Sequence, residues 1–259
     1  MRNFIKLFFA ISLFLSISNA NAFAQQDTLT QVSTIDALFN GIYDGETAIS
    51  ELKQYGNFGL GTFNALDGEM FLLDGRFYQI NADGKARQAD SNIKTPFAAV
   101  TFFETDQTLA LLPGVNFDSL KKQMDQVIPT PNLFYAIRIE GVFKAVKARS
   151  VPKQSKPYKK LQKKIIKTQP IFNYKDVEGT MGGFRCPPYV KGINIPGYHF
   201  HFVTKDGKAG GHVLEFTIKE AVLKIDHTSV LSIILPQDKA FYDADLTQNK
   251  EAELKKVER

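Results

Sequence analysis

Beyond residue 56 the apolar residues recur at every second position, and three Asp-Gly dipeptides interrupt the pattern, at Asp67-Gly68, Asp74-Gly75 and Asp83-Gly84. A period of two is typical of a strand with one buried face, and Asp-Gly favours the tight turn of a β-hairpin. The pattern therefore predicts an antiparallel meander. The apolar run at 97–103 (FAAVTFF) indicates a further, buried strand.

Four segments carry helical signals instead. Residues 33–40 predict a short helix with a Ser-Thr pair at its start, and residues 46–55 predict a second one that ends at a glycine. In residues 117–128, apolar side chains recur on one helical face before a proline ends the helix. The polar tail at 247–258 predicts a last short helix.

The rest of the chain is rich in β-branched residues and glycine. Residues 133–151 predict two strands around Gly141, and residues 177–235 predict several more. We therefore expect an α+β fold with two β-rich domains, mixed or antiparallel sheets and a few short helices. The expected parts are a signal peptide at 1–22, an N-terminal β-rich domain at 27–152, a Lys-rich connector at 153–168 and a C-terminal β domain at 169–259.

The first 22 residues have the features of a secretory signal peptide. Arg2 and Lys6 precede an apolar run of 11 residues, 7–17, which is too short to span a membrane comfortably. Ala20-Asn21-Ala22 then fits a small-x-small cleavage site, with Ala22-Phe23-Ala24 as the alternative. We expect the mature protein to be exported, to the periplasm or the medium, and to have no membrane segment once the signal is cleaved.

Charge and cysteine content narrow the function. The net charge is +5, and two of the positive charges lie in the expected signal peptide. The Lys-rich connector lacks interleaved aromatic residues, so we expect no nucleic-acid partner. Cys186 is the single cysteine, which excludes an intramolecular disulfide and a zinc site built from thiolates.

Three of the four histidines lie close together in the sequence. His199 and His201 sit in the run GYHFHFV, where residues two apart on a strand share one face. If Asp206-Gly207 forms a two-residue hairpin turn, His212 lies directly opposite His201 and on the same face. A bulge at Gly210 and Gly211 would instead turn His212 to the opposite face.

Three converging imidazoles suggest a metal centre. Three protein ligands with an open fourth position are typical of catalytic Zn²⁺, and imidazole also suits Cu, Fe and Ni. Because neutral histidines leave the charge of the cation uncompensated, we expect an anionic substrate that binds through oxygen. His227 lies outside this pattern, and we expect it to be structural.

Several segments together resemble the α-acetolactate decarboxylase family, and the resemblance runs from about residue 30 to the end of the chain. No single motif is specific, but their order and spacing are. The motifs are YDG at Tyr43–Gly45, FGLGTFNALDGEM at Phe58–Met70, NLFYAIRIEG at Asn132–Gly141, KTQPIF at Lys167–Phe172, and GYHFHF followed by GGHV.

The resemblance implies a zinc enzyme that converts 2-acetolactate, a small 2-hydroxy-3-keto acid, to (R)-acetoin and CO₂. It further implies a homodimer of two-domain subunits with zinc near the domain junction. The implied zinc ligands are His199, His201 and His212, the implied catalytic residues are Glu69, Arg149 and Glu258, and the implied substrate-binding residues are Thr62 and Arg149.

The expected chemistry is metal-assisted decarboxylation. A cation that binds the keto and hydroxyl oxygens would stabilise the enediolate that remains when the substrate loses CO₂. The enediolate is then protonated on one face. Glu69 and Glu258 would flank the substrate, and Arg149 would bind its carboxylate or assist protonation. Glu251 or Glu253 could replace Glu258 as the tail residue. Without the resemblance, Glu69 and Arg149 would be read as surface residues of strands and Glu258 as part of a disordered terminus.

Two other functions fit the histidine hairpin. A cupin-like metal oxygenase also begins its motif with His-x-His, but it needs a glutamate a few residues later, where this chain has Lys205 and Asp206. An exported metal- or ligand-binding β-domain would need no more than the hairpin itself.

Overall fold

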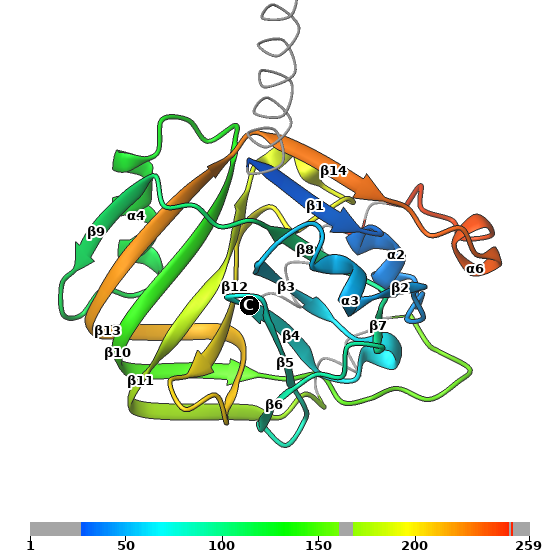
Figure 1. The fold of residues 1–259 in the computed structure, drawn as a ribbon, viewed down its shortest axis with the longest axis horizontal. Helices are drawn as coiled ribbons and strands as arrows, with labels where there is room; N and C mark the ends of the chain where they lie inside the picture. Colours follow the sequence, from blue (N-terminus) through cyan, green and yellow to red (C-terminus); the bar gives the residue numbers. More distant parts are fainter. Residues whose placement is uncertain (1–26, 161–167, 249, 251–259) are drawn as a thin grey trace, which may run out of the picture.

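The computed structural model describes residues 27–160, 168–248 and 250, and strands from Thr28 to Ile234 assemble into two large sheets (Figure 1). The expected signal peptide and the tail from 251 onwards lie outside the described residues. In order across the sheet, the seven-stranded sheet contains β14 (Val230–Ile234), β1 (Thr28–Val32), β8 (Ala98–Thr101), β3 (Phe58–Thr62), β4 (Glu69–Leu73), β5 (Arg76–Ile80) and β6 (Ala86–Gln88).

The predicted meander is confirmed as β3 to β6, which pair antiparallel in sequence order. At the turn between β4 and β5, Asp74 and Gly75 both have positive φ, 51° and 74°. These are the values that a tight two-residue hairpin turn requires. The predicted strand at 97–103 is also present, as β8, and all four of its residues are buried.

The far side of this sheet joins the two ends of the described chain. β1 pairs antiparallel with β8 and parallel with β14, so the sheet is mixed. The register brings Thr28 opposite Val230. The first strand of the described chain is therefore hydrogen-bonded to the last one.

The five-stranded sheet is built from longer strands. It contains β9 (Gln107–Leu111), β10 (Phe134–Arg149), β11 (Ile171–Cys186), β12 (Gly197–Thr204) and β13 (Gly210–Thr228). β10 pairs with both β11 and β13, while β12 bridges β11 and β13, so the pairings close into a ring. In Figure 1 these strands form the half of the molecule opposite β1 and β3.

The prediction of two strands around Gly141 is wrong, because 134–149 is one continuous strand. Gly141 serves close packing and not a turn. A Cβ at this position would lie 2.2 Å from the carbonyl oxygen of Glu220 on β13. Any larger residue would push the two strands apart.

The helices are short and few among the described residues. α2 (Ile35–Phe39) begins at Thr34, whose hydroxyl accepts a hydrogen bond from the Ala37 N–H, as the sequence predicts. α4 (Phe117–Val127) buries Leu120 and Met124 on the predicted face. α6 (Lys239–Tyr242) follows β14, and single 3₁₀ turns occupy Asn64–Leu66 and Pro188–Val190.

The helix expected at 46–55 is shorter than predicted. Residues Thr47–Ala48 form β2, which pairs with β7 (Lys94–Thr95), and only Ile49–Leu52 form α3. The preceding Gly45 packs so closely on Thr95 that a Cβ would lie 1.8 Å from its carbonyl oxygen. This contact holds the segment extended.

A shared apolar core joins the two sheets. Phe58 and Phe71 from the seven-stranded sheet pack in one cluster with Phe134 and Phe184 from the five-stranded sheet. The rings of Phe58 and Phe184 meet edge to face, 6.0 Å apart. The expected class, β-rich with mixed and antiparallel sheets and a few short helices, is confirmed.

The expected domain boundaries stay a prediction. Both large sheets contain strands from before and after the Lys-rich segment, since β10 pairs with β11 and β1 pairs with β14. None of the helices in the described ranges has the length and apolar character needed to cross a membrane.

Candidate metal centre

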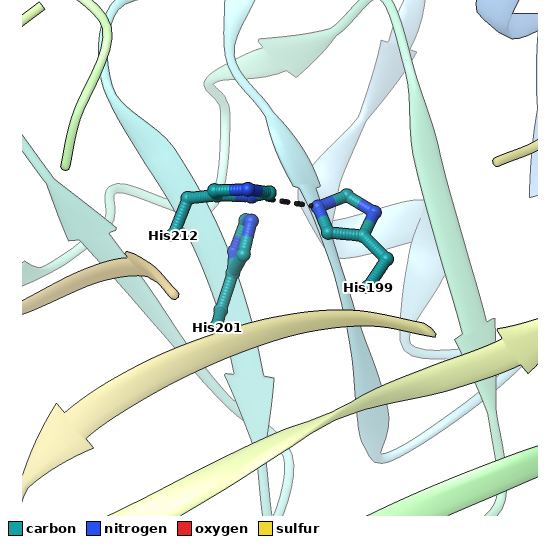
Figure 2. Close-up of side chains that lie close together, drawn as sticks. All are labelled: His199, His201 and His212. Atoms are coloured by element: carbon teal, nitrogen blue, oxygen red, sulfur yellow. Dashed lines mark hydrogen bonds between the residues drawn. The ribbon is translucent and has the colours of Figure 1, made fainter. Parts of the chain in front are cut away.

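The predicted hairpin of β12 and β13 brings three histidines together (Figure 2). His201 is paired with His212, Phe202 with Gly211 and Val203 with Gly210. This is the register that a turn at Asp206-Gly207 predicts, so the alternative with a bulge at the glycines is excluded. His199 lies two residues before His201 on β12 and therefore on the same face.

The three rings face a common point. Their ligand nitrogens all lie within 4.8 Å of one another. The closest pair is His199 Nε2 and His212 Nδ1, 3.0 Å apart (Figure 2). Three nitrogens this close, on rings that approach from two strands, are arranged to bind one cation.

The tautomer of His201 is set by β4. Its Nδ1 donates a hydrogen bond to the carbonyl oxygen of Met70 at 2.6 Å, so Nε2 carries the free lone pair. This Nε2 is buried and has no hydrogen-bond partner among the described residues, although Glu69 Oε2 lies 3.5 Å away. A backbone carbonyl behind an imidazole is the usual outer contact of a metal-binding histidine.

Burial keeps the three imidazoles neutral. It lowers the pKa of His201 to about 4, and it lowers those of His199 and His212 well below the ordinary value. The positive charge of Arg149 lowers all three further. Because a metal binds the neutral ring, these histidines are ready to coordinate at neutral pH.

The residues fit a metal ion. A buried ring nitrogen with a free lone pair is costly unless something binds it, and here it belongs to a set of three. The set contains nitrogen donors alone, which favours a borderline cation such as Zn²⁺ over Mg²⁺ or Ca²⁺.

A pocket opens beside the histidines, and it brings together the other predicted residues that the structure describes. Thr62, Glu69 and Arg149 line it together with His199 and His212. Thr62 and Glu69 are directly paired across β3 and β4, and the Thr62 hydroxyl donates to the carbonyl oxygen of Gly68 at 2.8 Å. The Glu69 side chain is 12% exposed. Glu69 is therefore not the exposed strand residue that its sequence context alone suggests.

Arg149 is also buried, with 5% of its surface exposed. It ends β10, where the register places it opposite His212. Its Nη1 donates to Oε1 of Gln169, which also lines the pocket. Arg149, His212 and His201 therefore occupy adjacent positions on three neighbouring strands.

The sequence did not reveal the apolar wall of the pocket, nor Gln169. Helix α2 and several separate segments build the wall, and no local motif marks them as one surface. Gln169 does lie in the KTQPIF segment, two residues before the partner of Arg149 in the register, which was the signal available. The wall residues are Ile35, Leu38, Phe39, Leu66, Phe97, Val151 and Ile195.

The remaining candidate residues are those of the tail and His227. Glu258, and its alternatives Glu251 and Glu253, fall outside the described residues. His227 stacks edge to face on Tyr135, 5.3 Å from ring to ring, and is not part of the triad.

A cupin-like site finds no support in this hairpin. Asp206 is exposed in the turn, where it accepts a hydrogen bond from the Thr204 hydroxyl. Glu215 forms an exposed ion pair with Lys147. Neither carboxylate is placed to complete the histidine set.

The chain is similar to proteins described as alpha-acetolactate decarboxylases. The family model described as alpha-acetolactate decarboxylase matches residues 29–248. The alpha-acetolactate decarboxylase of Methanosarcina mazei is 48% identical over 90% of this chain and 81% of its own length. That of Bacillus subtilis is 41% identical over 83% of this chain and 84% of its own length.

Solved structures agree with the sequence relatives. The crystal structure of alpha-acetolactate decarboxylase from Bacillus subtilis superposes with a TM-score of 0.86 at 39% identity, over 89% of this chain and 99% of that one. Residues 29–248, which the family model matches, include the histidine hairpin and all the residues that line the pocket. This chain belongs to the alpha-acetolactate decarboxylase family.

Proposed function

We propose that the protein is a zinc-dependent lyase that converts 2-acetolactate to (R)-acetoin and CO₂. The observation that carries the proposal is the pocket in which His199 and His212 meet Glu69 and Arg149. Such a pocket offers a cation site, a carboxylate and a guanidinium to one small anionic molecule. The family relationship supports the same reaction.

His199, His201 and His212 would hold the metal. When bound there, Zn²⁺ supplies Lewis-acid chemistry, drawing electron density from the carbon–carbon bond that breaks towards the substrate's carbonyl oxygen. The hydrogen bond from His201 to the Met70 carbonyl keeps that imidazole in the tautomer that binds metal.

Arg149 binds the substrate carboxylate in this proposal. Its guanidinium is buried in the pocket wall, and a buried charge–charge hydrogen bond is stronger than one in water. The pairing also orients the bond that must break, since the carboxylate is the group that leaves.

Glu69 is placed to handle a proton. Its carboxylate lies 3.5 Å from the metal-facing nitrogen of His201, on the pocket surface. Loss of CO₂ leaves a carbon that must take up one proton, and a carboxyl group on one side of the pocket delivers it to one face. We assign Glu258 to the same active site as a proposal from the family resemblance.

The apolar wall completes the site. The side chains that α2 contributes to it exclude water from the reacting carbon and accommodate the methyl groups of the substrate. Less water strengthens each electrostatic contact in the pocket.

An acetoin assay tests the proposal. Purified protein loaded with Zn²⁺ is given 2-acetolactate, and the product is resolved by chiral gas chromatography. We expect (R)-acetoin, loss of activity with a chelator and recovery on adding Zn²⁺. Absence of acetoin from protein shown by elemental analysis to carry zinc would exclude this function.

A homodimer also remains a proposal from the resemblance. Light scattering coupled to size-exclusion chromatography of the purified protein distinguishes a monomer from a dimer.

A further inference from the structure

We propose that Gln169 is a positioning residue that fixes the Arg149 guanidinium in the pocket while leaving its positive charge to an anionic ligand. This inference rests on the proposed function, in which Arg149 binds the substrate carboxylate. It concerns a residue one step further from the substrate.

The register of β10 and β11 places Gln169 close to Arg149. Arg149 is the last residue of β10, and its partner across the sheet is Ile171, the first residue of β11. The Ser150 N–H also donates to the carbonyl oxygen of Pro170, so the two chains stay together beyond the paired strands. Gln169 is therefore held beside the end of β10.

The next residue restricts the backbone of Gln169. A residue before proline is confined to extended conformations, because the proline ring clashes with the helical one. Gln169 thus has few backbone conformations to lose when its side chain engages Arg149. A contact prepared in this way costs little entropy to form.

The contact joins two groups of the pocket wall. Arg149 Nη1 donates to Gln169 Oε1, and both side chains line the pocket with Glu69, His199 and His212. A long arginine side chain needs such a partner, since its unrestrained rotamers would carry the guanidinium away from one fixed position.

The chemistry of the partner matters. An amide oxygen accepts a hydrogen bond but carries no net charge, whereas a glutamate of the same length would form an ion pair. Gln169 therefore orients the guanidinium without neutralising it. Substitution of this amide by a carboxylate separates orientation from charge.

The experiment compares Gln169→Glu and Gln169→Ala with the wild type, all as zinc-loaded full-length proteins. We expect Gln169→Glu to raise the KM for 2-acetolactate by about ten- to a hundredfold with a smaller change in kcat, the scale of one charge-assisted hydrogen bond. We expect Gln169→Ala to lower kcat/KM about tenfold through loss of orientation. Zinc content should stay at the wild-type level in both.

A second measurement separates charge from structure. Calorimetry gives the affinity for 2-hydroxyisobutyrate, which has a carboxylate, and for acetoin, which has none. Gln169→Glu should weaken the first and leave the second unchanged. Gln88→Glu, on the exposed residue Gln88 of β6, is the matched control and should change neither.

The proposal would be overturned if Gln169→Glu weakened the binding of both ligands equally or lowered the zinc content, because a residue that only supports the fold has those effects. It would also be overturned if the affinities and kinetic constants did not change, because Gln169 would then have no role in the site. A zinc-loaded wild type that makes no acetoin would overturn the decarboxylase function alone, since the calorimetric comparison still tests Gln169. A wild type that binds no 2-hydroxyisobutyrate would overturn the role given to Arg149 and, with it, that of Gln169.

Discussion

Of the three histidines in the candidate metal centre, His201 is the most deeply buried. It is fully buried, and its Nδ1–H is committed to the Met70 carbonyl. His199, in contrast, lines the open pocket. The deepest ligand is therefore the one whose loss should be hardest to compensate.

We predict that His201→Ala loses both zinc and turnover. Removing one of three protein ligands leaves two imidazoles, too few to retain the ion against water. Elemental analysis and the acetoin assay measure the two losses. His227→Ala is the control and should keep both, because His227 lies outside the triad. Full zinc occupancy in His201→Ala would contradict the assigned ligand set.

We predict that Glu69→Gln keeps zinc but loses turnover by about a hundred- to ten-thousandfold, the usual contribution of a general acid or base. The amide preserves the shape of the side chain and removes its proton chemistry. Metal analysis and kcat on the same preparation test this. A rate near that of the wild type would remove Glu69 from the mechanism.

The sequence predicts some site residues far better than others. The histidine set follows from one local turn, because the Asp-Gly dipeptide fixes the register of the hairpin. The pocket wall does not, because α2 and Ile195 meet only once the chain has folded. Burial of Glu69 likewise depends on distant segments that cover β4.

At the scale of elements, glycines on β11 decide how closely the strands of the site pack. A Cβ on Gly183 would lie 1.9 Å from the carbonyl oxygen of His199 and 2.9 Å from Leu60. β12 therefore occupies its place only because this position has no side chain. The same reasoning explains why Gly141 sits inside a strand and not at a turn, which the sequence pattern alone does not reveal.

We predict that Gly183→Ala displaces β12 and lowers zinc occupancy. The backbone of His199 must move to admit the new methyl group, and the ligand on that residue moves with it. Zinc titration of purified variants measures the effect. Gln88→Ala, at an exposed position of β6, is the control and should retain zinc. Equal retention by both variants would contradict the prediction.

Asp226, near the end of β13, carries a buried carboxyl group that the site does not use. It is 1% exposed and accepts a hydrogen bond from the Glu104 N–H at 3.2 Å. Burial, together with the negative charges of Asp106, Asp27 and Glu104, raises its pKa to about 7. The folded protein therefore holds this proton more tightly than the unfolded chain does.

This pKa predicts a pH-dependent stability. In the unfolded chain the Asp226 carboxyl ionises near pH 4, whereas in the folded protein it keeps its proton up to about pH 7. The free energy of unfolding that Asp226 removes therefore grows as pH rises from about 4 to about 7 and then stays constant. Asp226→Asn removes that cost. At pH 8 it should raise the free energy of unfolding by up to about 4 kcal/mol, and with it Tm, and at pH 4 it should have little effect on either.

Thermal denaturation of Asp226→Asn at both pH values tests this expectation. Asp176→Asn, at an exposed ion pair with Lys219, is the matched control and should show no such pH dependence. A gain for Asp226→Asn that is equal at pH 4 and pH 8 would show that its carboxyl is not protonated in the folded state.

At the scale of the whole molecule, the metal centre depends on contact between the two sheets. The three histidines come from the five-stranded sheet, while Met70, Glu69 and Thr62 come from the seven-stranded one. The strand content and the antiparallel meander were predictable from periodicity and turns. The exchange of strands between sheets was not, because period and turn signals describe neighbours along the chain only.

We predict that the exported protein begins at Phe23. A short apolar run behind two positive charges and before Ala20-Asn21-Ala22 is the pattern that signal peptidase cleaves. N-terminal sequencing of protein recovered outside the cytoplasm measures the position, and a start at Gln25 would indicate the alternative site. Protein recovered there with Met1 still in place would contradict the predicted cleavage, and recovery of the protein from the cytoplasm alone would contradict the predicted export.

The parallel pairing of β1 with β14 has a consequence for biosynthesis. The outer edge of β1 offers unsatisfied backbone groups until Val230 and its neighbours arrive, about two hundred residues later in translation. The edge of the seven-stranded sheet at β1 therefore stays unpaired for most of the synthesis of the chain. The seven-stranded sheet should therefore be completed only late in synthesis, when β14 pairs with β1, and truncated chains that lack β14 should be prone to aggregate.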